Sequence, residues 1–335
     1  LYTKYTAFEL GQFAFERLLA IAGDTNAGML YADRYLLKNG NSQQAPVIDY
    51  QKGSLRDDFD FGSLLFFRSS VLKQAVRAMD ADYRFAGLYD LRLRVSELAE
   101  LVHVNEYLYS EVETDIRKSG EKLFDYVDPK NRAVQIEMEA VCTAYLKRVG
   151  GYLAPDFEPV TFDAGGFEQE ASVIIPVRNR IRTIEDAIRS VLAQKTTFRF
   201  NLIIVDNHST DGTSEAIEKY TADGRVVHLV PERSDLGIGG CWNVGVHHPA
   251  CGKFAVQLDS DDVYSGPDTL QKIVDAFYEQ NCAMVVGTYR MTDFKMNEIP
   301  PGIIDHREWT LENGRNNALR INGLGAPRAF FTPIL

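Results

Sequence analysis

The strongest constraint on the fold is a regular alternation of short apolar runs and amphipathic segments from about residue 171 onward. The apolar runs have the length of buried strands, whereas Ile184, Ile188 and Val191 recur at the spacing of one helix face. Strands that alternate with helices predict a doubly wound, mostly parallel α/β sheet, in which ligands bind beyond the carboxyl ends of the strands. The predicted strands cover residues 172–176, 201–205, 226–230, 253–258 and 283–287.

The first 150 residues lack this alternation, and their mixture of helices and strands predicts an α+β half. A capping box at residues 6–9 predicts a helix that starts there. Residues 151–168 contain glycines and prolines without periodicity, which predicts a linker. A chain of 335 residues suits two domains, so we expect one over residues 1–150 and another over residues 169–335.

A weak internal repeat connects the two halves. Residues 15–37 resemble residues 273–295, and residues 61–68 resemble residues 325–331. The repeat predicts that one segment of sheet occurs twice. The N-terminal half would then resemble the C-terminal part of the fold to which the second half belongs.

The charge balance argues against one class of partner. The chain carries 36 basic and 47 acidic residues, a net charge of -11. An acidic chain repels phosphate backbones, so nucleic acid is not an expected partner. No apolar run approaches the length that spans a bilayer, and the charged residues near Leu1 argue against a secretory signal. Peripheral membrane contact and the oligomeric state stay open.

The number and spacing of the cysteines indicate the cellular compartment. There are four of them, and none forms a C-x-x-C pair. This count is low for a disulfide scaffold, so we expect reduced thiols in a cytoplasmic protein.

Polar motifs follow three of the predicted strands, at residues 176–180, 205–213 and 258–262. Asp259 and Asp261 lie two positions apart, so their side chains can point to the same side. Converging carboxylates repel one another unless a cation lies between them, and oxygen ligands favour Mg²⁺ or Mn²⁺. Such an ion takes its other ligands from water and substrate phosphates, and stabilises a leaving diphosphate. The alternative is that each motif is only a polar turn beside a helix.

In this order the motifs resemble the family 2 glycosyltransferases, which have the GT-A fold. The resemblance spans residues 171–289. It implies a GT-A-type sheet and inverting transfer of a sugar from a nucleotide-diphosphate donor, UDP-sugar by default, to a surface or capsular glycan acceptor. The matching segments are residues 172–179, 184–194, 205–213, 243–245 and 258–262.

The resemblance also implies roles for individual residues. Asp206 and Asn207 should contact the nucleotide base, where the family usually has two acidic residues. Asp259 and Ser260 should lie at the ribose or the donor sugar. The metal should be held by Asp261, Asp259 and Asp262. The nucleotide pocket should also include Pro176, Val177, Asn179 and Asn243.

The catalytic base is less evident, although an inverting transferase needs a carboxylate to accept the proton of the acceptor hydroxyl. In the family this is an Asp of a Glu-Asp pair in a segment after the acceptor-side strand, and the second half stops at Leu335 before such a segment. Residues 83–94 resemble that segment, with Tyr89 and Asp90 in place of the acidic pair. Asp90 is therefore the candidate base. The alternative is that it caps the helix that follows.

Two arrangements of the halves are open. In a tandem arrangement each half belongs to a separate transferase domain, and the first keeps only a degenerate or truncated remnant. In a permuted arrangement the first half completes the second, and Asp90 serves the site of Asp261. The repeated segments favour the tandem arrangement, because a permutation would not contain one strand twice.

A second set of residues has less specific signals. Trp242 stands where the family usually has a phosphate-facing arginine, and we expect it to pack in the core. Four arginines lie near the expected acceptor side, where they would meet an anionic acceptor or only solvent. They are Arg307, Arg315, Arg320 and Arg328.

Two other functions compete with glycosyl transfer. A nucleotidyltransferase would also use paired aspartates and a divalent ion, but residues 176–179 offer no Gly-rich loop with a basic residue. A catalytically idle glycan- or nucleotide-binding scaffold would explain why no catalytic base is evident.

Overall fold

The computed structural model describes residues 1–38, 40–112, 131–163, 165–307, 309–310, 314–321, 323–325 and 327–335. The chain divides into two compact units. The first unit comprises residues 1–154, 299–301 and 306–323, and the second comprises residues 155–298, 302–305 and 324–335. The predicted linker therefore contains one change of unit, but the chain changes unit again several times between Glu298 and Leu324.

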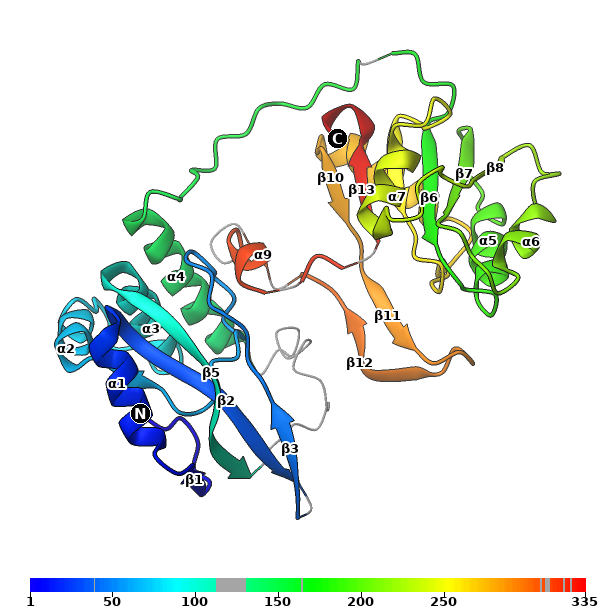
Figure 1. Ribbon diagram of the computed structural model, residues 1–335. Helices are drawn as coiled ribbons and strands as arrows, with labels where there is room; N and C mark the ends of the chain where they lie inside the picture. Colours follow the sequence, from blue (N-terminus) through cyan, green and yellow to red (C-terminus); the bar gives the residue numbers. More distant parts are fainter. Residues whose placement is uncertain are drawn as a thin grey trace. The chain divides into compact units, whose positions relative to one another are not determined.

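The second unit is built on a six-stranded sheet with the order β10-β13-β9-β6-β7-β8 (Figure 1). Strands β9, β6, β7 and β8 run parallel, whereas β13 is antiparallel to both β9 and β10. The strands are β6 (Ala171–Val177), β7 (Phe200–Asp206), β8 (Val226–Leu229), β9 (Phe254–Gln257), β10 (Met284–Val286) and β13 (Arg328–Phe331). A separate hairpin pairs β11 (Tyr289–Thr292) with β12 (Glu298–Ile304), and the short helix η3 (Thr332–Ile334) follows β13.

Helices cover both faces of this sheet with their apolar sides. Val173 and Ile175 of β6 pack in a cluster with α5 (Ile184–Leu192), α6 (Thr213–Glu218) and α8 (Thr269–Gln280). Ile174, between them, packs in a second cluster with α7 (Gly237–Val246). Because neighbouring strand residues face opposite ways, the uninterrupted apolar run of β6 is what two covered faces require.

The predicted fold class is confirmed for this unit. Each of the five apolar runs forms a strand, and the sheet is mostly parallel and doubly covered. Trp242 packs at the edge of the second cluster, as expected.

The first unit combines a mixed sheet with helices. Its strands follow the order β1-β5-β2-β3, with β4 paired to β2 and with β2 and β5 parallel. The strands are β1 (Phe8–Leu10), β2 (Ala27–Lys38), β3 (Asn41–Ala45), β4 (Phe66–Phe67) and β5 (Glu100–Val112). The helices are α1 (Ala14–Asp24), α2 (Ser69–Arg77), α3 (Gly87–Leu98), α4 (Arg132–Arg148) and α9 (Asn317–Arg320).

The prediction that the first helix starts at residues 6–9 is wrong. Phe8 and Leu10 instead lie in β1, which pairs with Glu111 and Tyr109 of β5. Helix α1 begins only at Ala14, after Phe13 in a left-handed conformation with φ 59°. Pairing with a long neighbouring strand outweighed the local capping signal, which is worth only about 1 kcal/mol.

The internal repeat has a structural counterpart. In the first unit β2 pairs antiparallel with β4, and Met29 lies opposite Phe67. In the second unit β10 pairs antiparallel with β13, and Met284 lies opposite Phe330. Both pairings join the repeated segments, which supports the proposal that the halves contain the same piece of a duplicated fold.

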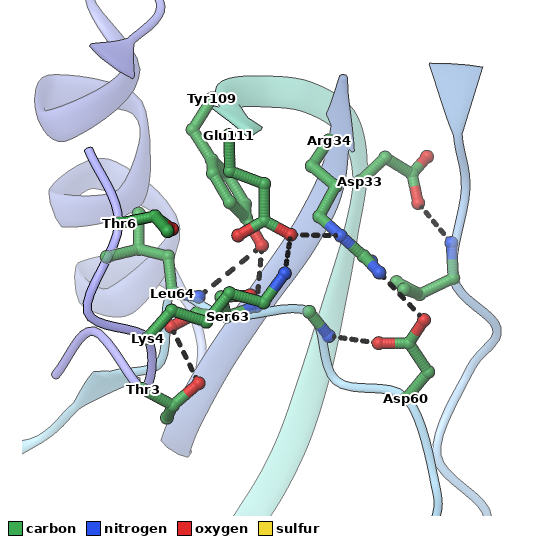
Figure 2. A network of polar contacts seen from close by, with 12 residues as sticks. Thr3, Lys4, Thr6, Asp33, Arg34, Asp60, Ser63, Leu64, Tyr109 and Glu111 are labelled. Atoms are coloured by element: carbon green, nitrogen blue, oxygen red, sulfur yellow. Dashed lines mark hydrogen bonds and ion pairs between the residues drawn. The ribbon is translucent and has the colours of Figure 1, made fainter. Parts of the chain in front are cut away.

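In the first unit, a network of charges surrounds the buried side chains of Arg34 on β2 and Glu111 on β5 (Figure 2). The carboxylate of Glu111 has no solvent exposure and accepts hydrogen bonds from Lys4 Nζ at 2.8 Å and Arg34 Nε at 2.9 Å. Arg34 also pairs with Asp60 at 2.9 Å, and Tyr109 Oη accepts a hydrogen bond from Ser63 N at 2.8 Å. A buried carboxylate is tolerated only with such partners, so these residues fix the first unit internally.

Candidate active site

The three polar motifs meet at one edge of the sheet in the second unit. In the parallel register Val177 lies opposite Asp206, and Ile174 lies opposite Gln257. The loops that leave β6, β7 and β9 are therefore neighbours at the carboxyl edge, where doubly wound sheets bind ligands.

The loops after β6 and β7 are joined by hydrogen bonds. Asn179 N donates to Ser209 Oγ at 2.9 Å, and Asn179 Oδ1 accepts from Thr210 N at 2.8 Å. Asn207 N donates to Val177 O at 2.8 Å. Asn179 has φ 55°, a left-handed conformation that asparagine tolerates better than most residues. The pocket residue predicted from the resemblance thus also shapes the loop.

Pro176 and Val177 are buried in β6, and Val177 packs in the apolar core. A nucleotide at the sheet edge would therefore meet these two residues mainly through their backbone groups. Asn207 is also buried, and its Oδ1 atom has no hydrogen-bond partner. Asn243 is exposed on α7.

Asp206 is the last residue of β7 and is fully buried. Its carboxylate accepts hydrogen bonds from Ser209 N at 2.9 Å and from Ser214 Oγ. His228 Nε2, from β8, lies 3.7 Å from Asp206 Oδ2, a distance suited to an ion pair and too long for a hydrogen bond. This group of partners was not predicted, although His228 could have been found because it lies on the neighbouring parallel strand.

These contacts shift both titrating groups. Burial raises the pKa of Asp206, but the opposing contacts with His228, Ser214 and Ser209 are stronger together and hold this pKa well below its usual range. The carboxylate of Asp206 raises the pKa of His228 against the effect of burial, with a smaller contribution from Glu218. Asp206 is therefore held as an anion, which accepts hydrogen bonds and donates none.

Three carboxylates follow β9. Asp259 is half-buried and accepts a hydrogen bond from Gln257 Nε2 at 2.9 Å, and Ser260 is buried. Asp261 and Asp262 are exposed, and Arg180 Nε lies 3.8 Å from Asp261 Oδ2. Desolvation, followed by the charges of Asp259 and Asp261, raises the pKa of Asp262 to about 6. Because Asp262 is exposed to solvent, the two like charges account for this shift better than burial does.

The donor set fits a divalent cation that is only partly held by protein. Within the described residues, no group of three or more His, Cys, Asp or Glu side chains is placed to hold a metal ion. Asp259, Asp261 and Asp262 bring three carboxylates to one loop, where like charges repel one another. Mg²⁺ and Mn²⁺ favour oxygen ligands, and Mg²⁺ in particular is often held by one or two carboxylates together with water and phosphate. The three residues match that pattern.

Asp90 lies in the first turn of α3 and is almost fully buried. One carboxylate oxygen pairs with Arg94 Nε at 2.9 Å, and the other lies 3.8 Å from Arg148 Nη2. The residue before the helix is Ala86, so Asp90 is not the N-cap residue. These contacts are those of a structural ion pair between α3 and α4, and they leave the identity of a base open.

The arginines expected near the acceptor side have other partners. Arg320 is fully buried in the first unit and pairs with Asp57. Arg315 donates to Tyr152 Oη at 3.0 Å, and Arg328 Nε donates to Gln257 Oε1 at 2.7 Å. Arg315, Arg320 and Arg328 therefore make structural contacts, which neither of the two alternatives foresaw.

The fold and this edge define the class of the second unit: a doubly wound α/β domain whose polar loops gather at the carboxyl ends of parallel strands. Residues 172–331 match the family model described as glycosyl transferase family 2. This part of the chain therefore resembles the glycosyltransferases of that family.

Individual relatives are similar over the same part. The chain is 33% identical over 120 residues to TuaG of Bacillus subtilis, named as a teichuronic acid biosynthesis glycosyltransferase, covering 36% of this chain and 46% of TuaG. It is 31% identical over 120 residues to EpsE of the same organism, named as a glycosyltransferase, covering 36% of this chain and 42% of EpsE. The matched region thus spans less than half the length of these relatives.

A solved structure of TarS from S. aureus, residues 1–349, has 26% sequence identity and a TM-score of 0.40. The similarity covers 50% of this chain and 48% of that chain.

No helix among the described residues is long and apolar enough to cross a membrane. All four cysteines are free thiols, and Cys142, Cys241 and Cys251 are buried.

Proposed function

We propose that the second unit binds a nucleotide-diphosphate sugar, UDP-sugar by default, and that the chain transfers the sugar with inversion to a glycan acceptor. The observation that carries the proposal is the meeting of Asp206 and the 259–262 carboxylates at one sheet edge in a family 2 domain. The biosynthetic name of TuaG supports a surface glycan as the acceptor.

In this proposal Asp206 binds the base. Its charge is fixed by Ser209, Ser214 and His228, so that it accepts hydrogen bonds from the base N–H groups in one orientation. Asn207 Oδ1, buried and without a partner, offers a second acceptor beside it.

Asp261, with Asp259 and Asp262, would hold Mg²⁺ or Mn²⁺. When bound, the ion supplies positive charge to the diphosphate that departs from the sugar. The carboxylates set its position, and Arg180 beside Asp261 is a second source of positive charge at that edge. Ser260 and Asn179 would complete the donor pocket.

The first unit is proposed to be the remnant of a duplicated transferase domain, with residues 1–150 as its main part. The shared strand pairing of β2 with β4 and β10 with β13 supports this tandem arrangement. The cytoplasmic location expected from the four thiols stays a prediction.

Release of UDP from a panel of UDP-sugars in the presence of Mn²⁺ tests the proposal. We expect the wild-type chain to hydrolyse one donor slowly and Asp261→Ala to lose this activity. The matched control is Asp223→Ala, which removes the ion pair with Arg225 just before β8 and should keep the hydrolytic activity. Equal activity of Asp261→Ala and the wild type would contradict the metal assignment.

A specific observation favours one alternative, an idle scaffold: the one candidate base, Asp90, is buried in ion pairs. This scaffold predicts nucleotide binding without release of UDP from any donor. The family match gives no support to a nucleotidyltransferase.

A further inference from the structure

A buried amide connects the sheet to the first carboxylate of the β9 loop. Gln257 is the last residue of β9 and is only 3% exposed. Its Nε2 atom donates to Asp259 Oδ1 at 2.9 Å, and its Oε1 atom accepts from Arg328 Nε at 2.7 Å. The three side chains form a line of hydrogen bonds that starts on β13 and ends at the proposed donor site.

The line has a fixed direction. A guanidinium group only donates and an ionised carboxylate only accepts, so the amide oxygen must face Arg328 and the amide nitrogen must face Asp259. If the amide group were rotated by half a turn, its nitrogen would face the guanidinium of Arg328 and its oxygen would face the carboxylate of Asp259. Each donor would then face a donor and each acceptor an acceptor. Arg328 therefore sets the orientation of Gln257, and Gln257 sets the position of Asp259 Oδ1.

The strand register explains why these residues meet. In the antiparallel pair β13 and β9, Ala329 lies opposite Val256, so the next residues along, Arg328 and Gln257, are cross-strand neighbours. Gln257 and Asp259 are two positions apart and share a side of the chain. The same alternation that indicates Asp259 and Asp261 could have indicated Gln257 from the sequence.

We propose that Gln257 and Arg328 are positioning residues for the sugar donor, acting through Asp259. They hold one oxygen of Asp259 toward the sheet, which leaves the other oxygen free to meet the donor or the metal in one geometry. The inference rests on the proposed function of the second unit and adds two residues to it. Neither residue is proposed to touch the reacting atoms.

Substitutions at Gln257 separate this role from plain stability. In Gln257→Glu the carboxylate still accepts from Arg328, but it cannot donate to Asp259 and places a like charge beside it. Gln257→Met keeps the side-chain length and removes both hydrogen bonds. Arg328→Lys keeps a donor toward Gln257, whereas Arg328→Leu does not.

A matched control lies at the opposite, amino-terminal ends of the parallel strands. Asn201 of β7 is also a buried amide, 5% exposed, and its Nδ2 atom donates to Ala250 O at 2.7 Å while its Oδ1 atom accepts from Ser172 Oγ. Asn201→Leu therefore removes a comparable pair of hydrogen bonds near the start of β7, away from the carboxyl ends of the strands where the donor site is proposed.

Titration calorimetry of the full chain with UDP and Mn²⁺, together with thermal unfolding of each variant, tests the proposal. We expect Gln257→Glu and Gln257→Met to weaken UDP binding about tenfold, Arg328→Leu to weaken it less, and Arg328→Lys to restore it. Asn201→Leu should lower the unfolding temperature and leave the dissociation constant unchanged.

The outcomes are distinguishable. Folded Gln257 variants with wild-type affinity for UDP would overturn the positioning role while leaving the donor site intact. A weakening that Asn201→Leu shares in proportion to its lost stability would overturn it as well, because the effect would then be general. If the wild-type chain bound neither UDP, GDP nor ADP with Mn²⁺, the proposed function would fall, and the role of Gln257 with it.

Discussion

Asp206 and His228 are a buried pair whose charges stabilise each other. The folded-state pKa of His228 is raised above its ordinary 6.5, so its contribution to stability is fully present below that pH and is lost as the pH rises through the raised value. The folded-state pKa of Asp206 is lowered from its ordinary 3.8, so its contribution is present above that value and is lost only in stronger acid. Both contributions to stability are therefore fully present between pH 3.8 and pH 6.5.

The raised pKa of His228 predicts how the stability of His228→Gln depends on pH. The variant should be less stable than the wild type in mildly acidic solution, and the difference in the free energy of unfolding should shrink as the pH rises past the His228 pKa. Urea unfolding at about pH 6 and about pH 9 measures it. His247→Gln, at an exposed histidine in the same unit, is the control. A difference that grew with pH would contradict the assigned pairing.

The positions of individual residues in the fold were predictable to different degrees. Asp206 and the 259–262 carboxylates follow from strand alternation and from the family resemblance, because their positions are set by where strands end. The partners Ser214 and His228 were missed because their contacts depend on the loop path and on strand pairing across β7 and β8. Asp90 was singled out by its neighbours in sequence, but its burial depends on the packing of α3 against α4.

At the scale of elements, α7 lies close to the sheet because Gly245 has no side chain. A Cβ atom there would lie 2.6 Å from Ile174 Cγ2 on β6, well inside van der Waals contact. The predicted α/β alternation fixed α7 as a helix between two strands. The close approach itself could not be predicted from the sequence, since a glycine in a helix has several explanations.

We therefore expect Gly245→Val to destabilise the second unit by about 1–3 kcal/mol through overpacking. On the same helix, a Cβ atom at Gly239 would meet nothing within 4 Å, so Gly239→Ala should be neutral or slightly stabilising. Chemical denaturation of both variants measures the difference. Equal stabilities would mean that α7 does not pack on β6 as described.

At the scale of the whole molecule, the domain-like units do not follow the sequence halves. Residues 306–323 lie inside the family match but fold as part of the first unit. Arg320 is the anchor of this segment: it is fully buried, pairs with Asp57, and donates to Gln135 Oε1 at 2.7 Å. The sequence predicted a single linker, because no local pattern reveals which unit a polar segment joins.

Removing one member of this buried pair should be costly, because it leaves the other charge without its partner. We expect Asp57→Ala to destabilise the first unit by about 3–5 kcal/mol. Hydrogen exchange at residues 314–321 should speed up at the same time. Arg56→Ala, which breaks the neighbouring exposed pair with Asp58, should change both readouts little. Unchanged protection in Asp57→Ala would show that Arg320 does not anchor the segment.

The second unit is proposed to bind a nucleotide diphosphate through a cation held by the β9 loop. Calorimetric titration of the full chain with UDP, with and without Mn²⁺, tests it most directly, alongside Asp261→Ala. We predict binding that requires Mn²⁺ and is lost in the variant. Binding by Asp261→Ala as tight as that of the wild type, or no Mn²⁺-dependent binding of UDP, GDP or ADP by the wild-type chain, would contradict the claim.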